Sequence, residues 1–194
     1  ADYAASKERI FTMQHVDKVA VIATEDDPTR MIASRINHRL MRVSSKQVGD
    51  QSRWPSLQGP HNAQNVAAAH AVAEVLGIKP ATVEEGLLTY PGLPHRMERV
   101  RELGGVLYVN DSKATNPTST APALAAYPAI HWILGGRAKT DKLDACAQHF
   151  DHVRAAYTIG EAGPMFAALL KDAMPVSECG ILSDAVIAAS NAAV

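Results

Sequence analysis

Seven consecutive residues, Asn110-Asp-Ser-Lys-Ala-Thr-Asn116, form the densest set of chemically capable side chains in this 194-residue sequence. They supply a carboxylate, two hydroxyls, an ammonium group and two carboxamides. The string follows a run of β-forming residues and precedes a helix-forming stretch. Backbone amides at such a turn can bind an anion, and Lys113 adds a positive charge. The same composition also fits a well-capped loop with a surface lysine, because polar strand-to-helix loops are common.

A second basic string, Leu134-Gly-Gly-Arg-Ala-Lys-Thr140, follows the next expected strand. Its glycines permit close backbone approach, and Arg137 and Lys139 supply positive charge. The string lacks the G-x-x-x-x-G-K-[ST] spacing of a phosphate-binding P-loop, which occurs nowhere in this sequence. Taken alone, this string favours a flexible basic loop over a binding site.

Shorter patterns carry amide, guanidinium and ammonium groups. Asn62 and Asn65 stand three residues apart at an expected helix start, so they share one face of that helix. Two carboxamides on one face could read the edge of a purine, whereas Asn62 could equally be a plain N-cap. Arg96 follows a proline-rich segment and could reach a phosphate, although an ordinary surface arginine fits as well. Lys7 lies in an expected first helix and resembles a solvated lysine.

Composition and charge narrow the classes of partner and location. The chain has 19 basic and 20 acidic residues and 47% hydrophobic residues, which is ordinary for a globular protein and argues against a nucleic-acid partner. Two cysteines are too few for a disulfide framework and fit a reducing compartment, so we expect a cytoplasmic location. Prolines interrupt the longest uncharged stretch, residues 114–136, which argues against membrane insertion.

Alternating strand-like and helix-like stretches predict an α/β fold. Before residue 92, strands are expected at 19–23 and 40–43, followed by a loop at 44–60 that could hold an edge hairpin. The string Tyr90-Pro-Gly-Leu-Pro94 is the best candidate for a linker. A hairpin through Gly104-Gly105 should follow, and then a doubly wound alternation of strands and helices. In that second half, strands are expected at 97–103, 106–110, 131–134 and 155–159, and helices at 118–126, 143–150, 161–170 and 183–190.

Six motifs in this order together resemble the Mur ligase family, the ATP-dependent amide-forming ligases of peptidoglycan precursor synthesis. They are Tyr3-x-x-x-Lys7 with Arg9-Ile10, Asp26-Asp27, Gly59-x-His-Asn-x-x-Asn65-x-x-Ala68-Ala69, Gly92-Leu-Pro-His-Arg96, Asp111-Ser-Lys-Ala-Thr-Asn116 and Leu134-Gly-Gly-x-x-Lys139. The resemblance implies two domains: the remainder of the central ATPase-type α/β domain at 1–92, and a Rossmann-like C-terminal ligase domain, truncated at its end, at 93–194. The family's sugar-nucleotide domain, P-loop and final segment have no counterpart in the sequence, so we expect a fragment that is inactive alone.

Within the family, the motifs are similar to the branch that adds D-glutamate to UDP-N-acetylmuramoyl-L-alanine. The resemblance implies ATP and Mg²⁺ as cofactors, an acyl-phosphate intermediate, these two substrates as partners, and a monomer. It implies catalytic roles for Lys113, Arg96 and Lys7, nucleotide binding by Asn62, Asn65, Arg96 and Asp111, and substrate binding by Thr115 and Lys139. Lys7 would bind a metal only if carbamylated, because an ammonium group cannot coordinate Mg²⁺.

Two alternatives stay open at this point. The chain could be a non-catalytic nucleotide-binding or interaction module, and an upstream P-loop in the gene would favour the ligase over the module. It could also belong to a folate- or peptide-extending ligase of the same superfamily. That alternative is disfavoured, because such a ligase should carry a different string at 111–116.

Overall fold

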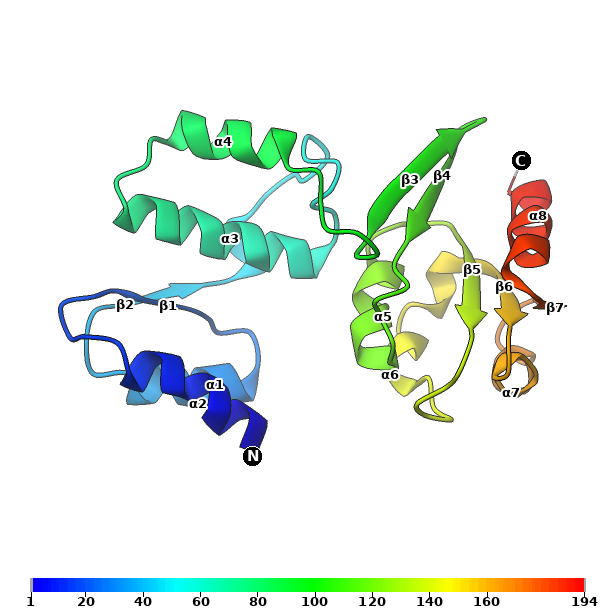
Figure 1. Cartoon of the computed structure of the whole chain (residues 1–194), viewed down its shortest axis with the longest axis horizontal. Helices are drawn as coiled ribbons and strands as arrows, with labels where there is room; N and C mark the ends of the chain where they lie inside the picture. Colours follow the sequence, from blue (N-terminus) through cyan, green and yellow to red (C-terminus); the bar gives the residue numbers. More distant parts are fainter. Residues whose placement is uncertain (1, 194) are drawn as a thin grey trace. The chain divides into compact units, whose positions relative to one another are not determined.

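The computed structural model describes residues 2–193. Its internal contacts divide the chain into two compact units, one ending at Tyr90 and the other beginning at Pro91 (Figure 1). Each unit combines helices with parallel strands, so the expected α/β fold class is confirmed. The assignment of a central and a C-terminal domain divided at residue 92 stays a prediction.

The first unit is built on two parallel strands. β1 (Ala20–Ala23) pairs with β2 (Leu40–Val43), and Ala20 lies opposite Leu40. The helices of this unit are α1 (Asp2–Thr12), α2 (Asp27–Arg35), α3 (Pro60–Val75) and α4 (Pro80–Thr89). Successive side chains of a strand point to opposite faces, so Ile22 packs on Ile32 of α2, whereas Val21 and Ala23 pack on α3. The two helices therefore cover opposite faces of this small sheet (Figure 1).

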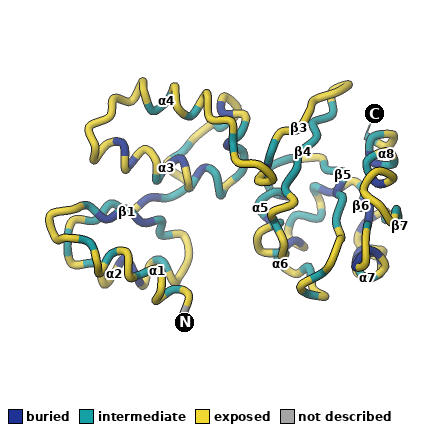
Figure 2. Tube along the Cα trace, in the orientation of Figure 1, coloured by how far each residue is buried: buried dark blue, intermediate teal, exposed yellow. Residues whose placement is uncertain are grey.

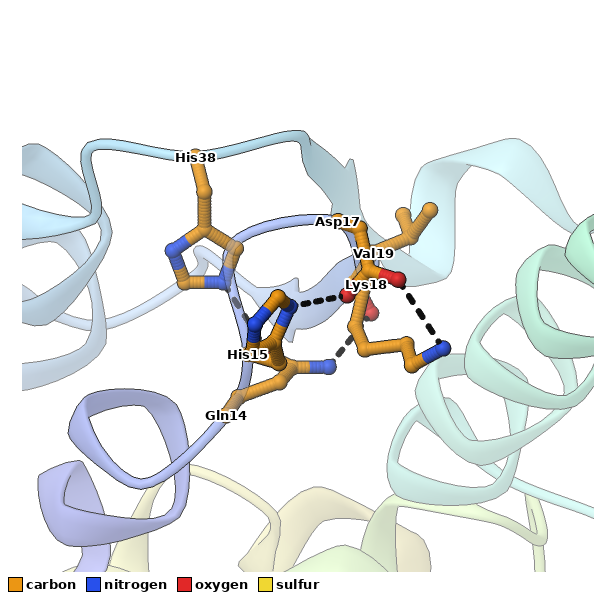
Figure 3. A network of polar contacts seen from close by, with 6 residues as sticks. All are labelled: Gln14, His15, Asp17, Lys18, Val19 and His38. Carbon is orange, nitrogen blue, oxygen red and sulfur yellow. Dashed lines mark hydrogen bonds and ion pairs between the residues drawn. The ribbon is translucent and has the colours of Figure 1, made fainter.

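Local capping and turn contacts fix the ends of these elements. Asp26 is the N-cap of α2, and its Oδ1 accepts a hydrogen bond from Thr29 N at 2.8 Å, as its place before Pro28 predicts. After α1, Gln14 Nε2 donates to the Val19 carbonyl oxygen at 3.0 Å, and Gln14 Oε1 lies 3.1 Å from His38 Nε2 (Figure 3). One side-chain amide therefore ties the end of α1 to the start of β1 and to the segment before β2.

The segment between β2 and α3 is a loop, as expected, but it is not polar throughout. It contains the short 3-10 helix η1 (Ser45–Gln47) and turns, so the suggested edge hairpin is wrong. Trp54 is buried with Leu57 against Val66 of α3, and its Nε1 donates to Glu84 Oε1 of α4 at 2.9 Å. An aromatic anchor therefore holds this segment to both helices.

The second unit begins with a hairpin and continues into a parallel sheet. β3 (Glu98–Leu103) and β4 (Val106–Asn110) pair antiparallel, as the Gly104-Gly105 turn predicts. β5 (Ile130–Gly135), β6 (Val153–Ile159) and β7 (Val176–Gly180) form a parallel sheet in that spatial order. The helices of this unit are α5 (Pro117–Ala125), α6 (Asp144–Ala147), α7 (Gly163–Leu170) and α8 (Leu182–Ala192), with the 3-10 turn η2 at Phe150–His152.

Two elements of the second unit differ from what its sequence predicts. β7 was not expected, because its string Val-Ser-Glu-Cys-Gly has neither an apolar run nor an alternating pattern. One helix was expected over 143–150, where the structure has the single turn α6 followed by η2.

Both faces of the parallel sheet of the second unit are covered. On one face, Trp132 and Leu170 belong to the larger of two hydrophobic clusters. On the other face, Tyr157 packs against Ala185 and Ala189 of α8. Figure 2 shows much of β6 buried, whereas the β3–β4 hairpin is half-buried or exposed. Burial raises the pKa of the Cys146 thiol to about 11, so this thiol is neutral near pH 7 and poorly reactive. Among residues 2–193, no helix combines the length and apolar character needed to cross a membrane.

Candidate functional site

The 110–116 loop, which follows β4, is ordered by its own polar groups. Asn110 Oδ1 accepts a hydrogen bond from Ser112 N at 3.1 Å, and the Asp111 carbonyl oxygen accepts one from Ala114 N at 2.8 Å. Asn116 ends the loop as the N-cap of α5, where its Oδ1 accepts from Ser119 N at 2.9 Å. The terminal carboxamides therefore shape the loop, and the Lys113 side chain is exposed between them.

The turn that carries Arg96 is bonded directly to this loop. Met97 N donates to Asp111 Oδ1 at 3.0 Å, and Lys113 N donates to the His95 carbonyl oxygen at 3.0 Å. Arg96 N donates to the Leu93 carbonyl oxygen at 3.1 Å, which closes the turn. The structure thus joins the backbone around Arg96, Asp111 and Lys113 into one framework within the second unit.

The glycine-rich loop after β5 brings a second lysine to the 110–116 loop. Lys139 Nζ donates to Thr115 Oγ1 at 3.3 Å, although the two residues are 24 positions apart. Gly135 and Gly136 have φ of 145° and 84°, and a Cβ on Gly135 would lie 2.8 Å from the Ile159 carbonyl carbon. Only glycine permits this close approach of the end of β5, where the basic loop begins, to Ile159 of β6. Lys139 and Thr115 are both exposed, so their groups are accessible to a ligand.

The amides predicted to bind a purine lie in the first unit. Gly59 is the N-cap of α3, so the reading of Asn62 as a plain N-cap is wrong. Asn62 Nδ2 donates to the Gln58 carbonyl oxygen at 3.0 Å, and Asn65 Nδ2 donates to Asn62 Oδ1 at 3.3 Å. The two carboxamides therefore share one face of the helix, as their spacing predicts.

Lys7 does not lie in a metal-binding set of side chains. It is exposed on α1, and its Nζ lies 5.3 Å from the centroid of the Tyr3 ring. Over residues 2–193 the structure contains no group of three or more His, Cys, Asp or Glu side chains that could hold a metal ion. The described residues alone therefore do not fit Mg²⁺, and no chemical step is assigned to a metal here.

Glu25, which sequence reasoning missed, braces the start of α3. Its Oε1 accepts from Ser44 Oγ at 3.0 Å and from Ser45 N at 3.1 Å, and its Oε2 accepts from Gln64 of α3. The hydrogen bond from the Ser45 hydroxyl is the main cause that holds the pKa of Glu25 below its ordinary value of 4.5. These partners converge only after folding, so no sequence pattern identifies them.

We expect acid to weaken the first unit through Glu25. The folded pKa lies below 4.5, so the stabilisation is complete above pH 4.5 and is lost as the pH falls through the lowered folded value. Between about pH 6 and about pH 3, Glu25→Ala should therefore lose less thermal stability than the wild type. In a Trp132→Phe background, Trp54 fluorescence reports this unit, and Glu74→Ala, an exposed change on α3, is the control. An identical pH dependence for Glu25→Ala and the wild type would contradict this role.

Comparison with known proteins decides the family. The family model described as "Mur ligase, glutamate ligase domain" matches residues 95–194, which is more than half of the chain. The chain belongs to the Mur ligase family. Arg96, Asp111, Lys113, Thr115 and Lys139 all lie within the matched region.

Relatives and solved structures cover the first unit as well. A UDP-N-acetylmuramoylalanine--D-glutamate ligase from Sphingopyxis alaskensis is 55% identical over 98% of this chain and 45% of its own length. A protein of the same name from Novosphingobium aromaticivorans is 54% identical over 100% of this chain and 45% of its own length. The chain thus spans just under half the length of these Mur ligases. A UDP-N-acetylmuramoylalanyl-D-glutamyl-2,6-diaminopimelate--D-alanyl-D-alanyl ligase structure from Acinetobacter baumannii shares the fold, with a TM-score of 0.67 at 20% identity over 98% of this chain and 48% of that one.

Proposed function

We propose that this chain is a segment of an ATP-dependent ligase that adds D-glutamate to UDP-N-acetylmuramoyl-L-alanine in peptidoglycan precursor synthesis. The observation that carries the proposal is the 55% identity to a relative of that name over 98% of the chain. The activity belongs to the complete ligase, because the chain spans 45% of that relative's length. A cytoplasmic location and a monomeric state belong to the same proposal. The name of this relative favours a ligase over a non-catalytic module.

The reaction requires charge stabilisation at two successive centres. ATP first phosphorylates the carboxylate of the sugar-nucleotide substrate, which releases ADP and leaves an acyl phosphate. The D-glutamate amine then attacks the acyl carbon, phosphate departs, and the amine loses a proton as the amide forms. Arg96 and Lys113 are assigned to the phosphate groups, where fixed cations stabilise the developing negative charge. Lys113 N donates to the carbonyl oxygen of His95, the residue before Arg96, and this bond supports a shared role at one centre.

The remaining site residues are assigned to substrate recognition. Lys139 and Thr115, 3.3 Å apart, would hold a carboxylate of D-glutamate through a charge-assisted hydrogen bond and a hydroxyl donor. Asn62 and Asn65 would contact the adenine of ATP, and Asp111 would accept a hydrogen bond from its ribose. Mg²⁺ enters this proposal only with the complete ligase, and Lys7 would bind it only as a carbamate.

The choice of amino acid tests the proposal. In the complete ligase supplied with ATP and UDP-N-acetylmuramoyl-L-alanine, D-glutamate should stimulate phosphate release, whereas L-glutamate, L-alanine and meso-diaminopimelate should not. Omitting the sugar nucleotide is the control for uncoupled ATP hydrolysis. Stimulation by diaminopimelate in place of D-glutamate would assign the segment to another ligase and contradict the proposal.

Lys139→Ala should weaken the use of D-glutamate specifically. Removal of a charge-assisted hydrogen bond is expected to raise the KM for D-glutamate about tenfold or more and to change the KM for ATP little. Lys142→Ala, three residues further along the same exposed segment, is the matched control. Steady-state kinetics with each substrate varied in turn measure both constants. An unchanged KM for D-glutamate in Lys139→Ala would remove this residue from the substrate site.

A further inference from the structure

Arg96 lies between two residues with an unusual backbone conformation. His95 has φ of 62° and Met97 has φ of 49°, and these are the non-glycine residues of the described chain with positive φ. The left-handed region is unfavourable for residues with a Cβ, so such residues persist only where neighbouring groups hold them. Two such residues flank the exposed Arg96. We infer that neighbouring groups hold this turn in a shape that sets the direction of the Arg96 side chain.

One carboxylate oxygen holds the first of these residues. Glu98 Oε2 accepts hydrogen bonds from His95 N at 2.9 Å and from Asn110 Nδ2 at 3.2 Å. Asn110 Nδ2 also lies 2.9 Å from His95 Nδ1, so both the backbone and the ring of His95 are engaged. The second residue, Met97, is 6% exposed, and Asp111 Oδ1 accepts its amide hydrogen bond.

The same turn also fixes the lysine of the neighbouring loop. His95 donates its amide hydrogen to Glu98 and accepts the Lys113 amide at its carbonyl oxygen, 3.0 Å away. A change in the conformation of His95 therefore displaces two residues. These are Arg96, which is covalently linked to His95, and Lys113, which is hydrogen-bonded to it. We call the hydrogen-bonded set of Glu98, His95, Asn110 and Lys113 the clamp. Lys139 and Thr115, which are assigned to D-glutamate, are not members of this set.

We propose that Glu98 is a positioning residue that sets the direction of Arg96 and the register of Lys113 in the ligase reaction. This inference rests on the proposed function and deepens it, because it assigns a role to a residue outside the predicted site. Glu98 acts through the His95 backbone and not through contact with substrate. Its loss should impair the steps that depend on the phosphate groups and leave D-glutamate binding intact.

The kinetic test compares four variants of the complete ligase. Glu98→Ala should lower kcat/KM for ATP about tenfold, the scale of one lost hydrogen bond to a charged group, with the KM for D-glutamate unchanged. Glu98→Gln should recover most of the activity, because both hydrogen bonds go to one oxygen that a carboxamide can supply. Glu98→Asp, which keeps the charge and shortens the reach, should behave like Glu98→Ala. Glu102→Ala is the matched control. Glu102 is an exposed residue of β3, and within the described chain its only ion pair is with Arg99, at 3.3 Å.

Hydrogen exchange in the 194-residue chain tests the clamp independently of activity. The amides of His95 and Lys113 should exchange faster in Glu98→Ala and Glu98→Asp than in the wild type, Glu98→Gln or Glu102→Ala. Unchanged exchange at His95 would overturn the proposal, whether or not the ligase is active. Equal kinetics for Glu98→Ala and Glu102→Ala in an active ligase would overturn it as well. A wild-type ligase without D-glutamate-dependent activity would refute the proposed function. The exchange result would still show whether Glu98 holds the backbone of His95.

Discussion

Lys113→Ala in the complete ligase is expected to lower kcat by about tenfold or more, the scale seen when a group that stabilises transition-state charge is removed. The side chain of Lys113 is exposed, and its backbone amide is bonded to His95. Alanine keeps that amide, so the loop should retain its shape while the charge disappears. The predicted loss is therefore one of chemistry and not of folding.

The controls for Lys113 separate charge from structure. Lys113→Arg keeps a cation and should retain more activity than Lys113→Ala, although the wider guanidinium group is no exact substitute. Lys171→Ala removes an exposed lysine at the end of α7 and should leave kcat unchanged. Measurement of single-turnover rates excludes product release as the cause. A Lys113→Ala enzyme with wild-type kcat would show that this residue is a surface lysine only.

Gly135→Ala is expected to destabilise the second unit by roughly 3 kcal/mol, since the new methyl group collides with backbone and adopts a positive φ. A Cβ at this position would lie 2.8 Å from the carbonyl carbon and 2.9 Å from the nitrogen of Ile159. Backbone atoms in a paired strand cannot move aside as a flexible side chain can. The collision is therefore expected to disrupt the pairing of β5 with β6.

The neighbouring glycine provides a matched control for this collision. Gly136 also has positive φ, but a Cβ there would have nothing within 4 Å, so Gly136→Ala should cost only about 1 kcal/mol. Urea unfolding in a Trp54→Phe background measures both variants, because the remaining tryptophan, Trp132, lies in β5. Equal losses of unfolding free energy for Gly135→Ala and Gly136→Ala would contradict the steric explanation.

The parts of the fold that were predictable have strong local signals. The Gly104-Gly105 hairpin turn depends on a few adjacent residues, and it occurs as expected. The Asp26 cap has an equally local cause, because Asp26 Oδ1 accepts a hydrogen bond from Thr29 N three residues further on. β7 was missed because a short strand at the edge of the sheet gains its order from pairing with β6, which its own composition does not encode. The burial of Trp54 was missed for a related reason, since its partners lie on α3 and α4.

The candidate site was also only partly predictable from the sequence. The side-chain types and their place after a strand pointed to the 110–116 loop, whereas the 134–140 string alone favoured a flexible basic loop, and only the family resemblance implied a role for Lys139. The structure brings Thr115 and Lys139 together. Glu98 gave no signal, because its role depends on the left-handed backbone of His95 and on Asn110 across the hairpin. Charged groups that act through backbone geometry are recognised only when that geometry is known.

The fate of the carboxylate oxygen shows whether the ligase reaction passes through an acyl phosphate. UDP-N-acetylmuramoyl-L-alanine labelled with heavy oxygen in its free carboxylate is incubated with the complete ligase, ATP and D-glutamate, and the products are analysed by mass spectrometry. An acyl phosphate requires one labelled oxygen to leave with the inorganic phosphate while the sugar nucleotide gains one glutamyl unit. We expect labelled phosphate and glutamyl product in equal amounts, formed only with D-glutamate. Unlabelled phosphate, or a labelled product formed with another amino acid, would contradict it.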